Sequence, residues 1–209
     1  MGLLKLISAG LRRIKYYIIV NVIAFIAGGI IGSMSWGNLG EQLYNELKKT
    51  AGFISPTNPL QVFTYILGHN MFIAYVLGYV LGILIATPLL VMVINGIGIS
   101  SVVAYFSAKS HIPVPLVVLA LLPHGSFEVP ALILASSVGI DFGVSTWKRL
   151  LKKIPKEEYH SRLKEEGAIL ILTVILLVVA ATIETSLIVL GSMIAKNIGN
   201  GTIIPSKWS

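Results

Sequence analysis

The sequence contains no cysteine, which excludes a disulfide framework, a thiolate metal site and a thiol nucleophile. Charge is also scarce: only 12% of the 209 residues are Asp, Glu, Lys or Arg, whereas about 25% are charged in an ordinary soluble domain. None of these four residue types occurs between residues 50 and 108. A soluble globular domain is therefore excluded. The charge-free run is long enough for two helical membrane crossings of about 20 residues each.

Apolar stretches predict an all-α polytopic membrane bundle with five crossings, forming a single transmembrane domain over residues 1–209. A basic leader of fifteen residues precedes the first stretch, which is too long for the apolar region of a signal peptide. The expected spans are residues 16–36, 59–82, 88–107, 113–138 and 167–195.

The fourth span is expected to be broken at Pro123-His124-Gly125. Pro123 lies near its centre and Pro130 follows two turns later, and each proline removes a backbone donor. Residues 139–147 would then lie along the membrane interface. A re-entrant half-helix followed by a full span is the competing layout.

The basic residues predict the orientation of the chain in the cell membrane. With five crossings, eleven of the 16 Lys and Arg residues fall on one side, in the leader and in a polar loop at 148–166. Cytoplasmic segments carry the excess of positive charge. The N-terminus and the loop 148–166 are therefore expected in the cytoplasm, and the C-terminus outside.

Two pairs of glycines lie one helical turn apart, Gly28 with Gly32 and Gly78 with Gly82. Such small-residue faces let another helix approach closely in a membrane. They make self-association, and hence a homo-oligomer, a plausible expectation.

Polar residues at membrane depth are the candidates for function, because their desolvation is costly. They belong to four different spans: His69, Asn70, Asn95, His124, Glu128 and Glu184. His124 and Glu128 are four residues apart and share a helix face. We expect them to form one buried site with Glu184, able to hold a proton or a divalent metal ion, with Asn70 and Asn95 as additional ligands. The alternatives are amides that join helices by hydrogen bonds and carboxylic acids that stay protonated.

Several other chemistries lack their sequence motifs. The sequence has no zinc-protease helix, nucleophile elbow or phosphate-binding loop. The hypothesis that the protein is an enzyme is therefore less favoured than a function without catalysis. No nucleic-acid-binding module is present either. The basic segment at 148–164 is better explained by attraction to the anionic headgroups of the lipid bilayer, or by docking of a protein partner.

The stretch from Leu122 to Ala131, with Pro123-His124-Gly125 and Glu128, resembles the signature of the stage II sporulation protein M family of integral membrane proteins. His69-Asn70, Asn95-Gly96 and the residues around Glu184 resemble that family's other polar positions. The namesake of the family is a multi-spanning scaffold that anchors cell-wall-degrading partners during sporulation. Relatives also occur in bacteria and archaea that do not sporulate, so the resemblance implies no sporulation role here.

The favoured function is thus an integral membrane scaffold or accessory protein with a buried His/Glu/Asn site and a membrane or soluble protein partner. An ion or small-solute pathway through that site is the alternative. An intramembrane metal-dependent enzyme is the second alternative, and it would need a metal with an open water position.

Overall fold

The computed structural model describes residues 2–53 and 58–199. Within these residues every regular element is helical, which confirms the predicted all-α class. The elements in chain order are α1 (Leu3–Met34), η1 (Trp36–Gly40), α2 (Glu41–Phe53), α3 (Pro59–Met71), η2 (Phe72–Tyr79), η3 (Val80–Leu84), α4 (Ala86–Ser110), α5 (Val114–Leu150) and α6 (Lys156–Gly199).

Within the described residues, five helices are long and apolar enough to cross a membrane, as predicted. They are α1, the run Pro59–Leu84 that joins α3 to η2 and η3, α4, α5 and α6. The second crossing changes its winding along its length, from α-helical to π-helical and then to 3₁₀. α2 is a shorter helix between the first two crossings.

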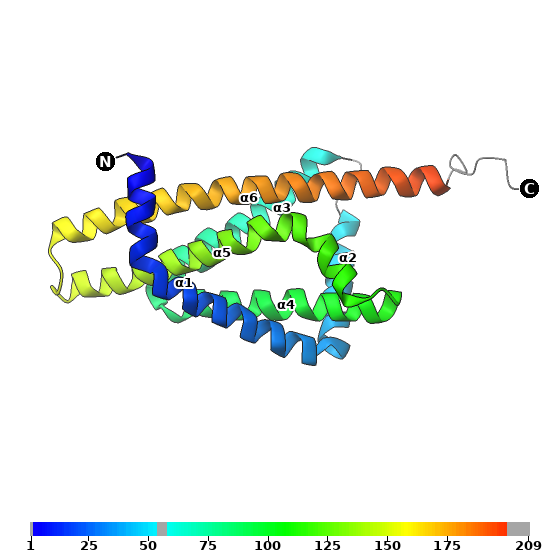
Figure 1. The fold of residues 1–209 in the computed structure, drawn as a ribbon, viewed down its shortest axis with the longest axis horizontal. Coiled ribbons are helices and arrows are strands. Elements are labelled where there is room, and N and C mark those ends of the chain that lie inside the picture. Colours follow the sequence, from blue (N-terminus) through cyan, green and yellow to red (C-terminus); the bar gives the residue numbers. More distant parts are fainter. Residues whose placement is uncertain (1, 54–57, 200–209) are drawn as a thin grey trace, which may run out of the picture.

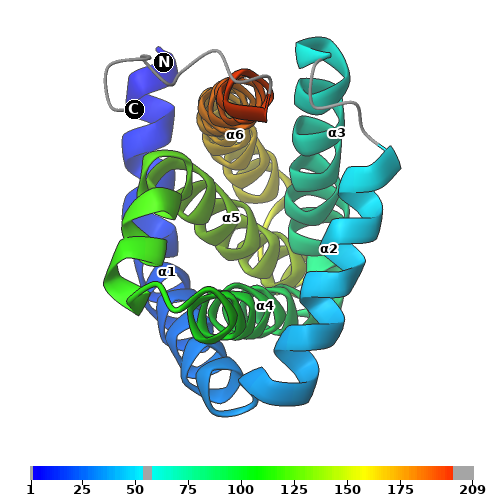
Figure 2. The ribbon, with the colours of Figure 1, turned by 90° about the vertical axis from the view of Figure 1, so that its right-hand side faces the viewer.

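α5 is the central helix of the bundle. Viewed end-on, it is surrounded by α1, α3, α4 and α6 (Figure 2). Its second part carries the core: Ala131, Leu132 and Ala135 are fully buried and cluster with Met92 of α4 and Leu177 of α6. Small side chains at this position of α5 let four neighbouring helices approach it closely.

The glycine pairs mediate contacts within the chain. Gly28 and Gly32 of α1 lie against the backbone of α4, and Ser101 of α4 donates a hydrogen bond of 3.0 Å to the Gly32 carbonyl. Gly82 lies against the backbone of Gly139 in α5. Both faces are therefore occupied, and they give no support to the expected homo-oligomer.

The predicted break at Pro123-His124-Gly125 is wrong, because α5 continues through Pro123 and Pro130 to Leu150. Each proline lacks a backbone N–H group and so removes one hydrogen bond from the helix. The hydrogen bonds on either side persist, so the helix bends and does not end there (Figure 1). The prolines are seven residues apart, about two turns, so both act on the same side of the helix. Residues 139–147 belong to this buried helix and do not lie along the interface, and a re-entrant half-helix is likewise wrong.

The predicted loop 148–166 is also shorter than expected. α5 ends at Leu150 and α6 begins at Lys156, so only five residues connect them. The charged residues at 157–166 suggested a loop by their polarity alone, but they lie on a helix, where some are exposed, Arg162 and Glu165 pair with other helices, and Glu166 is buried.

The orientation in the membrane is testable because the chain has no cysteine of its own. We expect an impermeant thiol reagent added to intact cells to label Lys196→Cys but not Lys156→Cys, since the charge bias places residue 156 in the cytoplasm. After the cells are permeabilised, both should react. Labelling of Lys156→Cys alone in intact cells would reverse the assignment.

Candidate functional site: a polar cluster between α5 and α6

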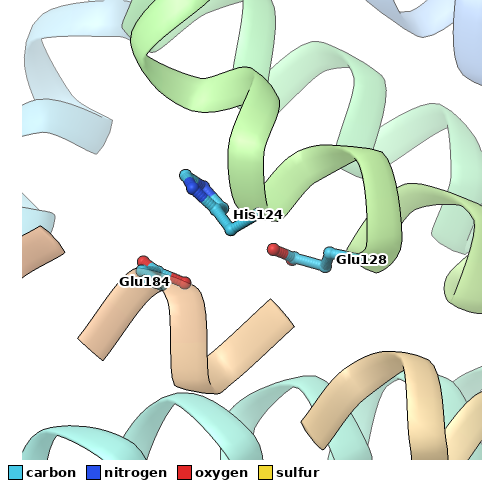
Figure 3. A group of neighbouring side chains, drawn as sticks. All are labelled: His124, Glu128 and Glu184. Carbon is cyan, nitrogen blue, oxygen red and sulfur yellow. The ribbon is translucent and has the colours of Figure 1, made fainter. Parts of the chain in front are cut away.

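Three ionisable side chains converge between α5 and α6, and we call them the His-Glu cluster: His124, Glu128 and Glu184. Each offers one ligand atom, and these atoms all lie within 4.8 Å of one another. Figure 3 shows His124 and Glu128 extending from α5 and Glu184 facing them from α6. The four-residue spacing on α5 puts its two members on one face. The structure thus brings together the three residues that the sequence singled out.

The His-Glu cluster makes no hydrogen bonds in the described part of the chain. His124 Nδ1 is buried and has no partner there. Buried polar side-chain atoms are almost always hydrogen-bonded in folded proteins. An unpartnered imidazole nitrogen beside two carboxylates therefore calls for a ligand.

No lysine or arginine among the described residues compensates the charge of the cluster. The Glu128 and Glu184 carboxylates interact with each other electrostatically, and Glu184 also interacts with His124 and His69. Neither carboxylate forms an ion pair with a lysine or arginine among residues 2–53 and 58–199. A negative site in a low-dielectric region attracts a cation or a proton.

The other polar residues predicted for the site are placed differently. Asn95 donates a hydrogen bond of 2.8 Å to the Val91 carbonyl of its own helix. His69 is exposed on α3, its ring stacks on Tyr65 with centroids 6.3 Å apart, and it lies close enough to Glu184 for the two to interact electrostatically. Asn70 is buried on α3, on the same face as Ile66, which packs against Ala181 of α6. Asn70 therefore lies toward α6, whereas Asn95 is occupied within α4.

The helix-bending residues determine where the cluster lies. Residues 114–123 of α5 are almost all exposed, whereas residues 131–145 are mostly buried. Figure 1 shows the first part of α5 bending away from α6 toward the end of α4. A side chain added at Gly125 would meet no atom within 4 Å. The His-Glu cluster therefore lies where α5 and α6 diverge.

A second polar group, which we call the arginine cluster, joins α1, α5 and α6 at the other end of the bundle: Arg13, Asp141, Arg162 and Glu165. Arg13 Nε pairs with Asp141 Oδ2 at 2.8 Å, and Arg13 also pairs with Glu165. Arg162 approaches the other Asp141 oxygen at 3.5 Å. Asp141 is only 2% exposed, so this group fastens three helices together.

Sequence reasoning missed the arginine cluster because it placed Asp141 near the interface, beyond a helix break that does not exist. The sequence feature that could have revealed this cluster is Asp141 itself, an isolated acidic residue within an apolar stretch of α5 that is rich in small residues. The neighbouring Glu166 is fully buried and receives a 3.4 Å hydrogen bond from the Tyr79 hydroxyl, and its other oxygen has no partner in the part of the chain that the structure describes. Because Glu166 is the last residue of the expected polar loop, the sequence did not predict that its side chain is buried.

Five apolar helices and two interhelical polar clusters define a multi-pass membrane protein. Residues 19–187 match the family model described as stage II sporulation protein M. The chain belongs to the stage II sporulation protein M family, and the matched range contains the whole His-Glu cluster.

One relative is the uncharacterized protein MJ0706 of Methanocaldococcus jannaschii. It is 32% identical over 171 residues, which cover 81% of this chain and 72% of the relative. No solved structure matches the chain.

Proposed function

We propose that the protein is an integral membrane scaffold that binds a transmembrane segment of a partner protein where α5 and α6 diverge. The observation that carries this proposal is the contrast along α5. Residues 131–141 pack in the core, whereas residues 114–123 leave large apolar side chains exposed. We call the opening between residues 114–123 of α5 and residues 186–194 of α6 the open fork.

Apolar exposure alone would be satisfied by lipid tails, which are as apolar as leucine. The open fork differs because the His-Glu cluster lies at its base. Lipid tails offer no donor or acceptor to an imidazole and two carboxylates, whereas a polypeptide or a bound cation does. A partner helix would cover both the apolar walls and the polar base.

Photo-crosslinking in native membranes tests this function. Leu121 lies two turns before Glu128 and Ile188 one turn after Glu184, so each shares a helix face with a carboxylate of the cluster, and they are 36% and 38% exposed. We expect a photoreactive residue at either position to capture one defined membrane protein. The control position is Ile23 on α1, which is 60% exposed and lies away from the fork. Only lipid adducts at all three positions would contradict the proposal, and an adduct of two identical chains would identify a second copy as the occupant.

An ion or small-solute pathway is the second candidate function, and a separate observation favours it. Buried polar atoms that have no partner among the described residues recur along the helices: Asn21 Oδ1, His124 Nδ1, Ser136 Oγ, Glu166 Oε1 and Thr185 Oγ1. Such atoms are the expected binding points of water molecules or ions along a path. Uptake of Mn²⁺ into proteoliposomes that is lost in Glu128→Gln would support this candidate over the scaffold.

A further inference from the structure

The His-Glu cluster combines one imidazole and two carboxylates from two helices, with ligand atoms within 4.8 Å of one another. This set could be explained by direct hydrogen bonds among protonated groups or by an ion between them. The spacing distinguishes the two. The structure contains no hydrogen bond between these three side chains, and buried His124 Nδ1 has no partner in the described residues.

Ligands of a common metal ion do not touch one another. With metal–ligand distances of about 2.0–2.2 Å, two ligand atoms at the tetrahedral angle lie roughly 3.4 Å apart. Side-chain rotations that move ligand atoms by about 1 Å would close the observed spread to that value. The cluster makes no direct hydrogen bond in the structure, and its ligand atoms lie within reach of one metal ion.

The charges favour a divalent ion. Two ionised carboxylates and a neutral imidazole carry a charge of minus two, and no lysine or arginine among the described residues pairs with them. An uncompensated pair of charges at membrane depth is strongly unfavourable. One divalent cation neutralises the site completely.

The donor atoms restrict the choice of ion. Ca²⁺ and Mg²⁺ prefer oxygen ligands and more of them, whereas Zn²⁺, Mn²⁺ and Fe²⁺ accept imidazole together with carboxylates. We propose that His124, Glu128 and Glu184 bind one divalent transition metal ion. Three protein ligands would leave a coordination position open for water or a partner group. The metal site itself does not depend on the proposed scaffold function; only the use of the open position by a partner does.

The absence of cysteine makes a direct test possible. In Glu128→Cys, a thiolate would replace one carboxylate, and added Co²⁺ should give a sulfur-to-cobalt charge-transfer band in the absorption spectrum. The matched control is Ser126→Cys, two residues away on an exposed position of the same turn. We expect the band in Glu128→Cys and none in Ser126→Cys or in the unmodified protein.

Metal affinity gives the second measurement. The purified protein, stripped with a chelator, should bind one Zn²⁺ or Mn²⁺ per chain, and Glu128→Gln and Glu184→Gln should each weaken binding at least tenfold. Ser126→Ala should bind as tightly as the unmodified protein, and circular dichroism would verify that all variants remain helical. Equal binding by all variants, or no charge-transfer band in Glu128→Cys, would overturn the proposal. Crosslinking at Leu121 and Ile188 would be unaffected by that failure, so the two proposals fail independently.

Discussion

Replacement of Asp141 by asparagine is expected to lower the free energy of unfolding by about 3 kcal/mol, because it leaves two arginines without their shared buried partner. Asp141 is 2% exposed and receives Arg13 on one oxygen and Arg162 on the other. In this variant Arg13 would still pair with Glu165, and Arg162 with Glu158. The expected loss of stability is therefore at the low end of the range for removing one partner of a buried ion pair. Denaturant or thermal unfolding in detergent would measure the effect.

Glu158→Gln is the matched control for Asp141→Asn. Glu158 also pairs with Arg162, at 2.8 Å, but it lies one turn away on the same helix and is 42% exposed. Exposed pairs of this kind contribute about 0.5 kcal/mol or less. Equal small losses in the two variants would show that the arginine cluster is well hydrated and does not fasten the helices.

The number and type of the helices could be predicted because they follow from composition and length. The charge-free run of residues 50–108 is long enough for two apolar helices, which satisfy their own backbone groups within a bilayer. The His-Glu cluster could be predicted from the sequence for a related reason. Ionisable residues at membrane depth are few, and the four-residue spacing of His124 and Glu128 fixes their common face.

Helix rotation and helix continuity could not be predicted in the same way. Asn95 and Asn70 have similar depths. Asn95 donates a hydrogen bond to the backbone of its own helix, α4, whereas Asn70 lies on the side of α3 that faces α6. Nothing in a single sequence specifies these rotations. The continuity of α5 through Pro123 depends on neighbouring helices that hold the bent segment, which are long-range contacts. The misplacement of Asp141 followed from that one error.

The glycine pairs illustrate the same division between local and long-range information. Their spacing indicated that a helix would approach closely, but it did not say which helix. In the structure, Gly78 and Gly82 face Gly139 and Gly143 of α5, so four glycines from two segments interlock. Close backbone contact of this kind has no flexible side chain that could move aside.

Gly139→Ala is therefore expected to destabilise the protein by about 3 kcal/mol, at the upper end of the cost of overpacking. A β-carbon at this position would overlap the carbonyl oxygen of Gly78 and crowd the backbone of Tyr79, so the two helices must separate. Their separation would also loosen the core that Ala135 and Leu132 form with neighbouring helices. The midpoint of thermal unfolding in detergent should fall accordingly.

Gly68→Ala makes the same chemical change on α3, where an added β-carbon meets no atom within 4 Å. Alanine is favoured over glycine within a helix by about 1 kcal/mol, so this variant should be as stable as the unmodified protein or more stable. The two alanine substitutions are thus expected to have opposite effects. A similar loss of stability in both would mean that glycine flexibility, and not close contact with Gly78, explains the requirement at position 139.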